Sequence, residues 1–270
     1  MRLISPHKNI GLQRDAYRNQ GSNLDLQYEP EAWDWFRRVE LTGATFGPNA
    51  LAIAINKLAF STFWAGCKAD GIDEAIQQLI FLRGVSTLVG TLVPFKGPAP
   101  TNILFVQGSL NPATGMVGNN INQSLDLNVS NSSTPQNDNH NAVWIVSIGG
   151  TGGQIGSAAV VAGINRISRF DGSFFIRNRN SSATSIGAGT VNFLGVSRNN
   201  ESNCTVRNNN TTQTIAQASQ APDSGNLTAF SLGDGAYSDG RMAAISNGTN
   251  LNLALLDARL TTLFNTLTWP

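Results

Sequence analysis

Pro94-Phe95-Lys96-Gly97-Pro98-Ala99-Pro100 is the stretch at which the character of the chain changes, and the fold class follows from it. Three prolines and a glycine in so short a stretch interrupt both helices and central strands. Beyond it, over 101–247, short β-prone segments alternate with clusters of Asn, Gly and Ser at intervals of roughly 8–15 residues. Many short strands with turn signals between them predict an antiparallel sandwich or barrel.

Within this region the segment Ala142-Val143-Trp144-Ile145-Val146 is apolar without alternation, which is typical of a strand buried on both faces. Asp171-Gly172 and 208–210 are typical of hairpin turns. The glycine-rich run 149–156 has no following Lys, so it predicts a flexible hairpin loop and not a phosphate-binding loop. The segments predicted as strands are 103–106, 142–148, 156–162, 173–177, 190–197, 204–207, 211–217, 226–232, 236–238 and 241–246.

The two flanks have helical periodicity. Pro30 followed by an acidic first turn predicts a short helix to about Glu40. Asn49 is a plausible cap for a helix over 49–65, and a run of leucines predicts another over 251–266. Apolar spacing also predicts a helix over 73–83 and a short piece within 87–94. We therefore expect four parts: an arm (1–45), a helical unit (46–100), a sandwich (101–248) and a C-terminal helix that packs on the helical unit (249–270).

The chain is polar without being strongly charged. Of its 270 residues 13% are charged and the net charge is +1. The chain therefore lacks the positive electrostatic potential that attracts phosphate groups, which argues against nucleic acid as a partner. No apolar run approaches the roughly 18 residues of a membrane span, and the N-terminus lacks the apolar core of a signal peptide. We expect a protein made in a cytoplasm, without membrane insertion, whose polar surface suits an extracellular or virion setting.

Residues suited to catalysis are scarce. Cys67 and Cys204 have no metal-ligand spacing and predict two buried thiols, so no metal or other cofactor is expected. Beyond residue 100 the only glutamate is Glu201, whereas glycosidases need two juxtaposed carboxyls. His140 lies in a polar stretch that predicts a surface turn, and no nucleophile elbow accompanies it. The remaining acidic residues of the sandwich region, mostly in loop-like contexts, are Asp126, Asp138, Asp171, Asp223, Asp234 and Asp239.

Arginines gather loosely with aromatic residues between 166 and 207. Arginine together with Asn and Asp in loops suits saccharide binding through hydrogen bonds and stacking, and the alternative is that these arginines tie long loops to the body of the fold. The loops considered for saccharide binding are 119–140, 149–156, 177–182 and 199–210. The candidate saccharide contacts are Asn137, Asp138, His140, Arg177, Arg179, Arg198 and Asn208.

Several short motifs resemble a family of tailed-phage structural proteins. The most specific is Gly66-Cys67-Lys68-Ala69-Asp70-Gly71-Ile72. The resemblance extends over roughly 49–265. The other motifs that carry it are Ala75-Ile76, Leu82, Thr87-Leu88, Gly90, Leu92-Val93-Pro94, Lys96-Gly97, Ala99-Pro100-Thr101-Asn102, Phe105-Val106, Asn111, Thr114-Gly115, Gly118-Asn119, Pro135-Gln136-Asn137, His140, Gly195–Ser197 with Arg198, and Leu251–Arg259.

The resemblance implies a concanavalin A-like (LamG-type) jelly roll in a virion protein. The family has no set of catalytic residues that could be assigned to positions in this sequence. We expect a mainly β, non-enzymatic structural protein displayed on a tail fibre or baseplate, with a host saccharide as candidate ligand. One alternative is a capsid decoration or head-fibre protein. Another is a polysaccharide depolymerase.

The N-terminal arm, 1–45, has no counterpart in the resemblance. It is too polar to build a core of its own, yet it offers scattered apolar side chains. We expect it to attach the protein to other virion proteins, in a homo-oligomer. The expected anchoring residues are Leu3, Ile4, Ile10, Leu12, Trp33 and Trp35.

Overall fold

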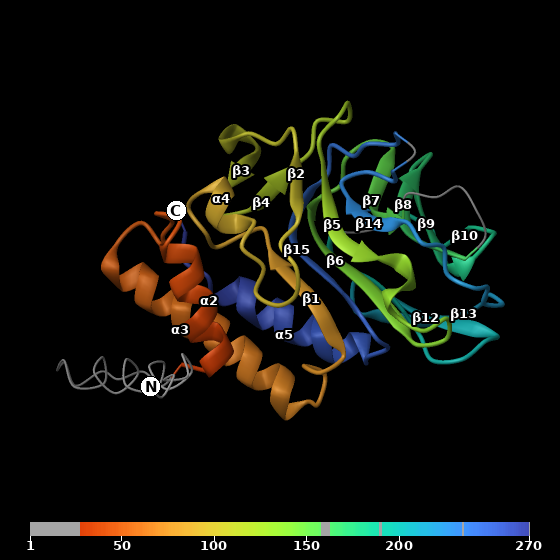
Figure 1. Cartoon of the computed structure of the whole chain (residues 1–270), viewed down its shortest axis with the longest axis horizontal. Coiled ribbons are helices and arrows are strands. Elements are labelled where there is room, and N and C mark those ends of the chain that lie inside the picture. The colour runs from red at the N-terminus through yellow and green to blue at the C-terminus, as the bar shows by residue number, and fades with distance from the viewer. Residues whose placement is uncertain (1–27, 158–162, 189–190, 234, 270) are drawn as a thin grey trace, which may run out of the picture.

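The computed structural model describes residues 28–157, 163–188, 191–233 and 235–269. Two antiparallel sheets stack as a jelly-roll sandwich, and helices gather on one side of it (Figure 1). The prediction of a mainly β sandwich is therefore confirmed. The predicted anchors Leu3, Ile4, Ile10 and Leu12 lie outside the described residues.

The sheet next to the helices, called sheet A, has eight strands among the described residues, in the order β13-β12-β11-β6-β15-β4-β3, with β1 also paired to β15. Asn139–Ser147 (β6) and Arg241–Gly248 (β15) are its central pair. Its other strands are Ile76–Phe81 (β1), Leu110–Asn111 (β3), Gly115–Val117 (β4), Asn192–Arg198 (β11), Asn203–Asn208 (β12) and Thr211–Ala216 (β13).

The second sheet, called sheet B, has seven described strands in the order β10-β9-β8-β7-β14-β5-β2. The sandwich core lies between the sheets, where Val143 and Val196 of sheet A face Ile167 and Ile176 of sheet B. Each of these side chains is at most 1% exposed. The strands of sheet B are Thr101–Ile103 (β2), Ser124–Ser130 (β5), Gly152–Ser157 (β7), Ile164–Phe170 (β8), Ser173–Asn180 (β9), Thr184–Ser185 (β10) and Asn226–Ala229 (β14).

Of the α-helices in the described residues, Pro30–Glu40 (α2), Ala50–Ala69 (α3) and Leu253–Thr266 (α5) cover the outer face of sheet A. The one-turn helix Leu88–Thr91 (α4) instead contributes Leu88 to the sandwich core. The caps are local, since Asn49 accepts a hydrogen bond from Ala52 and Asn252 accepts one from Ala254, each at 3.0 Å. α5 lies antiparallel to α3, and Arg259 in its middle is paired with Asp70, just after the end of α3, at 2.7 Å. Two short 3-10 turns, Gln107–Ser109 and Asn131–Ser133, complete the described elements.

The helix predicted over 73–83 is wrong, because this segment contains strand β1. Ile76, Leu79 and Ile80 are spaced as on one helix face, but the same residues can serve a strand that is buried on both faces. In β1, Leu79 packs among the helices while Ile80 packs in the sandwich core. The segment forms a strand and not a helix because it pairs with β15, which lies far along the chain. Local spacing of apolar residues alone does not distinguish the helical period from that of a buried strand.

The glycine-rich run 149–156 is also not the loop that its composition predicts, because β7 begins at Gly152. A Cβ at Gly153 would lie 2.3 Å from the Leu232 side chain. Glycine is therefore needed here, because it lets the segment around Leu232 pack directly on the strand backbone. Strands β3, β4, β5, β8 and β10 have no counterpart among the predicted segments, because they are very short or because polar residues hide the alternation. Of the strand predicted over 156–162, residues 158–162 lie outside the described residues. The segment 236–238, predicted as a strand, forms none.

One helix of the described chain, α3, is by length and composition apolar enough to cross a membrane, with half of that window buried in the fold. This corrects the expectation that no such segment exists, since alanines and glycine extend the run between its larger apolar residues. The absence of membrane insertion stays a prediction.

Aromatic rings fill the core beneath α2 and α3. Trp35 is fully buried and its ring centroid lies 4.8 Å from that of Phe60 and 5.5 Å from that of Phe81 on β1. Its indole Nε1 donates a hydrogen bond to the Val93 carbonyl at 2.9 Å. Trp35 therefore stabilises the chain's own core and is not available as an anchor for a partner, whereas Trp33 is 39% exposed.

We expect Trp35→Ala to lower the free energy of unfolding by about 3–5 kcal/mol, because it opens a cavity and leaves the Val93 carbonyl without its donor. The matched change at an exposed ring, Trp33→Ala, should cost about 1 kcal/mol or less. Chemical denaturation of both variants measures the difference. Equal losses would contradict the assigned role of Trp35.

Candidate functional site

Four loops meet at the end of the sandwich where β6 begins and β11 ends. We call this the polar end, and it comprises 131–138, 180–183, 199–202 and 217–220. Ser219 joins three of the loops, because its hydroxyl contacts Asn137 and Gln136 while its backbone N–H donates to the Glu201 carbonyl. Asn180 in turn donates to the Ala218 carbonyl. The loops therefore form one continuous surface of amide and hydroxyl groups.

A buried arginine supports this surface from below. Arg198, at the end of β11, is 1% exposed and faces the interior of the sandwich. Its guanidinium donates to the carbonyls of Asn178 at 2.8 Å, Gln217 at 2.7 Å and Asn200 at 3.0 Å, and to the Asn178 amide oxygen at 2.8 Å. Burial lowers the pKa of Arg198. One side chain thus ties strand β9 to two of the surface loops.

Gln217 performs a similar role. Its side chain is 4% exposed, accepts a hydrogen bond from the Asn178 backbone at 3.1 Å, and donates to the Ile176 carbonyl at 3.0 Å and to Thr184 at 2.8 Å. No signal in the sequence marks Gln217 or Asn178 among the many amides of the chain. Their roles follow only from the meeting of β9, β10 and β13.

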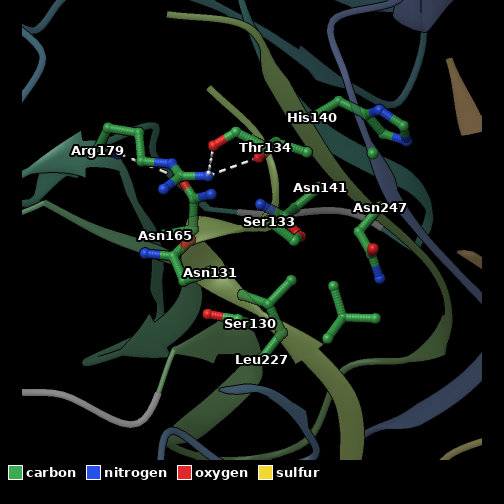
Figure 2. A pocket seen from close by; sticks show the side chains of 12 residues that line it. Ser130, Asn131, Ser133, Thr134, His140, Asn141, Asn165, Arg179, Leu227 and Asn247 are labelled. Atoms are coloured by element: carbon green, nitrogen blue, oxygen red, sulfur yellow. Dashed lines mark hydrogen bonds between the residues drawn. The ribbon is translucent and has the colours of Figure 1, made fainter. Parts of the chain in front are cut away.

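Arg179 lies beside a small interior pocket between the sheets. Its Nη2 donates to Thr134 Oγ1 at 2.6 Å, and burial lowers the pKa of Arg179 to about 10. Figure 2 shows the guanidinium directed at Thr134, with Asn141 close by. His140, Asn141, Asn165, Arg179 and Asn247 line this pocket and are each 1–2% exposed, so a saccharide does not reach them from the surface.

His140 is therefore not the surface turn residue that its neighbours in sequence predict. It lies in β6, where its Nε2 and the Ser246 hydroxyl are 2.9 Å apart and its Nδ1 contacts the Thr249 carbonyl. Burial lowers the pKa of His140 from 6.5 to about 4. The imidazole is thus a neutral, interior group and does not contact a ligand at the polar end.

We expect the free energy of unfolding to fall as the pH decreases from about 6.5 to 4. The unfolded chain takes up a proton on His140 in this range and the folded chain does not, so protonation favours unfolding. The shift from 6.5 to about 4 corresponds to roughly 3 kcal/mol when complete. Denaturation of His140→Gln should show a flatter pH profile, and an NMR titration with an ordinary histidine pKa would contradict the assignment.

The other predicted contacts are spread over three places. Asn137 and Asp138 are half-buried at the polar end, where Asp138 accepts a hydrogen bond from the Asn250 backbone at 2.7 Å. Arg177 lies on the outer face of sheet B, opposite Arg166 in the register. Asn208 pairs with Leu194, about 14 Å along the strand from the polar end, so it is not part of this surface.

Arg179 and Arg198, predicted as saccharide contacts, are instead interior supports. Arg198 donates through all three of its nitrogens to oxygens of the chain, and Arg179 donates through Nη2 to Thr134, whereas its Nε and Nη1 are buried without a partner. This agrees with the alternative that arginines tie the loops to the fold. The reason lies in the backbone: Arg179 has a φ of +56°, which departs from the regular alternation of β9 and turns its side chain inward beside that of Asn178.

Several carboxylates of the sandwich bind the chain's own groups. Asp126 accepts from the Asn226 amide at 3.0 Å, Asp223 from Ser157 at 2.8 Å, and Asp239 from the Gly150 backbone at 2.6 Å. Among the described residues no group of three His, Cys, Asp or Glu side chains could hold a metal ion. These carboxylates hold loops and strands in place.

The two cysteines are buried free thiols, as predicted. Burial raises the pKa of Cys67 to about 12 and that of Cys204 to about 11. The reactive thiolate is therefore disfavoured at both positions.

We expect Arg198→Ala to lower the free energy of unfolding by about 2–4 kcal/mol, because three buried carbonyls lose their donor. Arg198→Lys should also destabilise, since an ammonium cannot reach all of these acceptors at once. The control is Arg177→Ala, on the outer face of β9 in sheet B, which should change stability by less than about 1 kcal/mol. Similar losses for Arg198→Ala and Arg177→Ala, measured by thermal and chemical unfolding, would overturn the supporting role.

No protein-family model matches the chain, and no curated protein matches its sequence. Solved structures with a similar arrangement include the botulinum neurotoxin serotype D binding domain, with 12% identity over 70% of this chain and 51% of that one at a TM-score of 0.47. Trypanosoma rangeli sialidase in complex with sialic acid is 11% identical in sequence. The match covers 71% of this chain and 33% of the sialidase chain, at a TM-score of 0.43. Domain 4 of a GH43 arabinanase from Geobacillus stearothermophilus, in complex with arabinotriose, is 11% identical in sequence. The match covers 68% of this chain and 97% of that domain, at a TM-score of 0.40. The chain thus spans about a third of the sialidase and half of the toxin domain.

Proposed function

We propose that this chain is a non-enzymatic structural protein of a tailed-phage virion, in which the polar end of the sandwich binds host saccharides. The observation that carries the saccharide part is the polar end itself: four loops rich in amides and hydroxyls, with the carboxylates of Asp138 and Glu201 among them. Ser219 joins three of these loops, Asn180 joins the fourth, and Arg198 supports them. The motifs that resemble phage structural proteins support the virion part, with a tail fibre or baseplate as the site of display.

The chemistry of the polar end suits sugar hydroxyl groups. Asn199, Ser181 and Ser182 are exposed, and Asn137 and Asn180 are half-buried beside them. Amides and hydroxyls both donate and accept, as a sugar hydroxyl does. Because the loops are held together before any ligand arrives, less conformational entropy is lost when a ligand binds. Affinity per site would be weak and would gain from several copies on one particle.

The helical side suits attachment. The chain enters the described structure at Tyr28 beside α3, where Lys68 is paired with Glu29 at 2.9 Å and Glu31 at 2.7 Å. Residues 1–45 would then contact other virion proteins, in a homo-oligomer, at a distance from the polar end. Deletion of 1–27 should abolish incorporation into particles while the purified domain still folds.

We expect weak binding of neutral oligosaccharides on a glycan array, with no release of reducing ends. Asn199→Glu combined with Ser182→Glu should lower binding at least tenfold, since both exposed side chains lie on the polar end. Asn122→Glu, at an exposed position near the opposite end, is the control and should bind as the unaltered chain does.

Two outcomes would contradict the proposal. Binding that is unchanged in the double variant would place the saccharide site elsewhere, and an unaltered chain that binds no glycan on the array would refute saccharide binding. Turnover of a glycan that is abolished by changing Asp126, Asp171 or Glu201 would instead support a polysaccharide depolymerase.

A further inference from the structure

Arg179 is buried in the sandwich with most of its hydrogen-bond donors unpaired. It is 1% exposed, and of its guanidinium nitrogens only Nη2 has partners, the hydroxyl and carbonyl oxygens of Thr134 at 2.6 and 3.4 Å. Nε and Nη1 are buried and have no partner among the described residues. Arg198 is equally buried, but all three of its nitrogens donate to oxygens of the chain. The buried donors of Arg179 therefore still require acceptors.

The positive charge of Arg179 also lacks a counter-charge in contact with it. Burial lowers the pKa of Arg179 to about 10, so the guanidinium is still protonated at neutral pH. Asp223 partly offsets this charge, but its Oδ2 accepts hydrogen bonds from Asn131 at 2.7 Å and Ser157 at 2.8 Å, and no ion pair joins it to Arg179. Arg198 adds a second positive charge to the same interior. Because a buried charge without a close partner is costly, this part of the interior favours a negative group.

A second donor borders the same interior pocket. Arg179 of sheet B and Asn141 of sheet A both line it, as Figure 2 shows. Asn141 is 2% exposed, and neither its amide nitrogen nor its amide oxygen has a partner among the described residues. The amide can therefore turn by 180° without losing a bond, so that its NH2 group points at a ligand. Unpaired N–H groups thus reach the pocket from both sheets.

The size of the pocket restricts the ligand to a single atom or a molecule of similar size. Its free volume is about 10 Å³, which is that of one water-sized sphere. Sulfate, phosphate and carboxylate-bearing molecules are larger than this. A water molecule could accept from the N–H groups, but it would leave the charge of Arg179 without a counter-charge. A halide ion both accepts from N–H groups and carries the opposite charge.

We propose that this pocket binds one chloride ion, held by Nε and Nη1 of Arg179 and by the amide NH2 group of Asn141. The ion would offset the buried charge of Arg179 and fill the space beneath the loop 131–138, which the same guanidinium contacts at Thr134. Its role is to stabilise the interior below the polar end. The proposal does not depend on saccharide binding at the surface.

The side chain of Asn131 fixes where in the pocket the ion would lie. Its Nδ2 donates to the Gly163 carbonyl at 3.0 Å and to Asp223 at 2.7 Å, so this amide cannot turn. Its Oδ1 is buried without a partner among the described residues and would repel an anion. We therefore expect the ion beside Arg179 and Asn141, away from Asn131 Oδ1.

The test follows the unfolding of the full chain while sodium chloride replaces sodium methanesulfonate at constant ionic strength. Methanesulfonate is too large for the pocket and serves as the inert anion. Only the folded chain has the site, so each tenfold increase in chloride above its dissociation constant should raise the free energy of unfolding by about 1.4 kcal/mol. Bromide should act in the same way, because its size and charge are similar.

Two variants and a control assign the effect to the pocket. Arg179→Gln should remove the dependence on chloride, whatever its effect on stability itself. Asn141→Asp should also remove it and should fold without halide, because a carboxylate then takes the place of the ion beside Arg179. Arg37→Gln removes one exposed positive charge from α2 and should keep the full dependence on chloride.

A crystal of the full chain soaked in bromide locates the ion directly. We expect an anomalous peak within hydrogen-bond distance of Arg179 Nε or Nη1. Unfolding that is insensitive to chloride and bromide, or a pocket that holds water and no bromide, would overturn the proposal. So would an equal loss of chloride dependence in Arg37→Gln and Arg179→Gln, since the effect would then be general screening. Saccharide binding by a chain that is insensitive to halide would refute the ion and leave the proposed function intact.

Discussion

The pairing of β1 with β15 is the contact on which the rest of the structure depends. β15 lies in the middle of sheet A, paired with β6 along most of its length and with β1 beside it. β1 comes from before the proline-rich connector and β15 from the end of the sandwich, so this pairing joins the two halves of the chain. Through it the aromatic core beneath the helices, which contains Leu79 and Phe81 of β1, becomes continuous with sheet A.

Sheet A separates two cores, and this explains why its central strands are apolar on both faces. In β6, Val143 and Ile145 point into the sandwich, while Ala142 and Trp144 point toward the helices, where Trp144 lies 5.0 Å from Phe264 between ring centroids. In β1 the same division separates Leu79 from Ile80. A strand of this kind gains stability from burial on each side, so both layers contribute to the same sheet.

The polar end obeys a different constraint, since polar groups enclosed between two sheets must find partners. Arg198, Asn178 and Gln217 satisfy one another and the nearby carbonyls, and the loops above them are held in one arrangement. A network of this kind contributes little net stability per bond but is costly to disrupt. The result is a surface whose shape is held by the buried network beneath it, while exposed amides and hydroxyls of the loops point outward.

The sequence alone determined the features that depend on neighbouring residues. The change of composition at Pro94–Pro100, the both-faces burial of 142–146 and the helix cap at Asn49 could all be predicted, because turns, periodicity and caps are local. Only the tertiary structure decided that 76–81 is a strand, that Gly152 opens a strand under Leu232, and that Arg179 and Arg198 face inward. Each of these depends on a partner distant in sequence, and local periodicity carries no information about which partner a segment will meet. The candidate site was therefore predicted as a set of loops, whereas the division between its exposed amides and its buried arginines was set by how the two sheets stack.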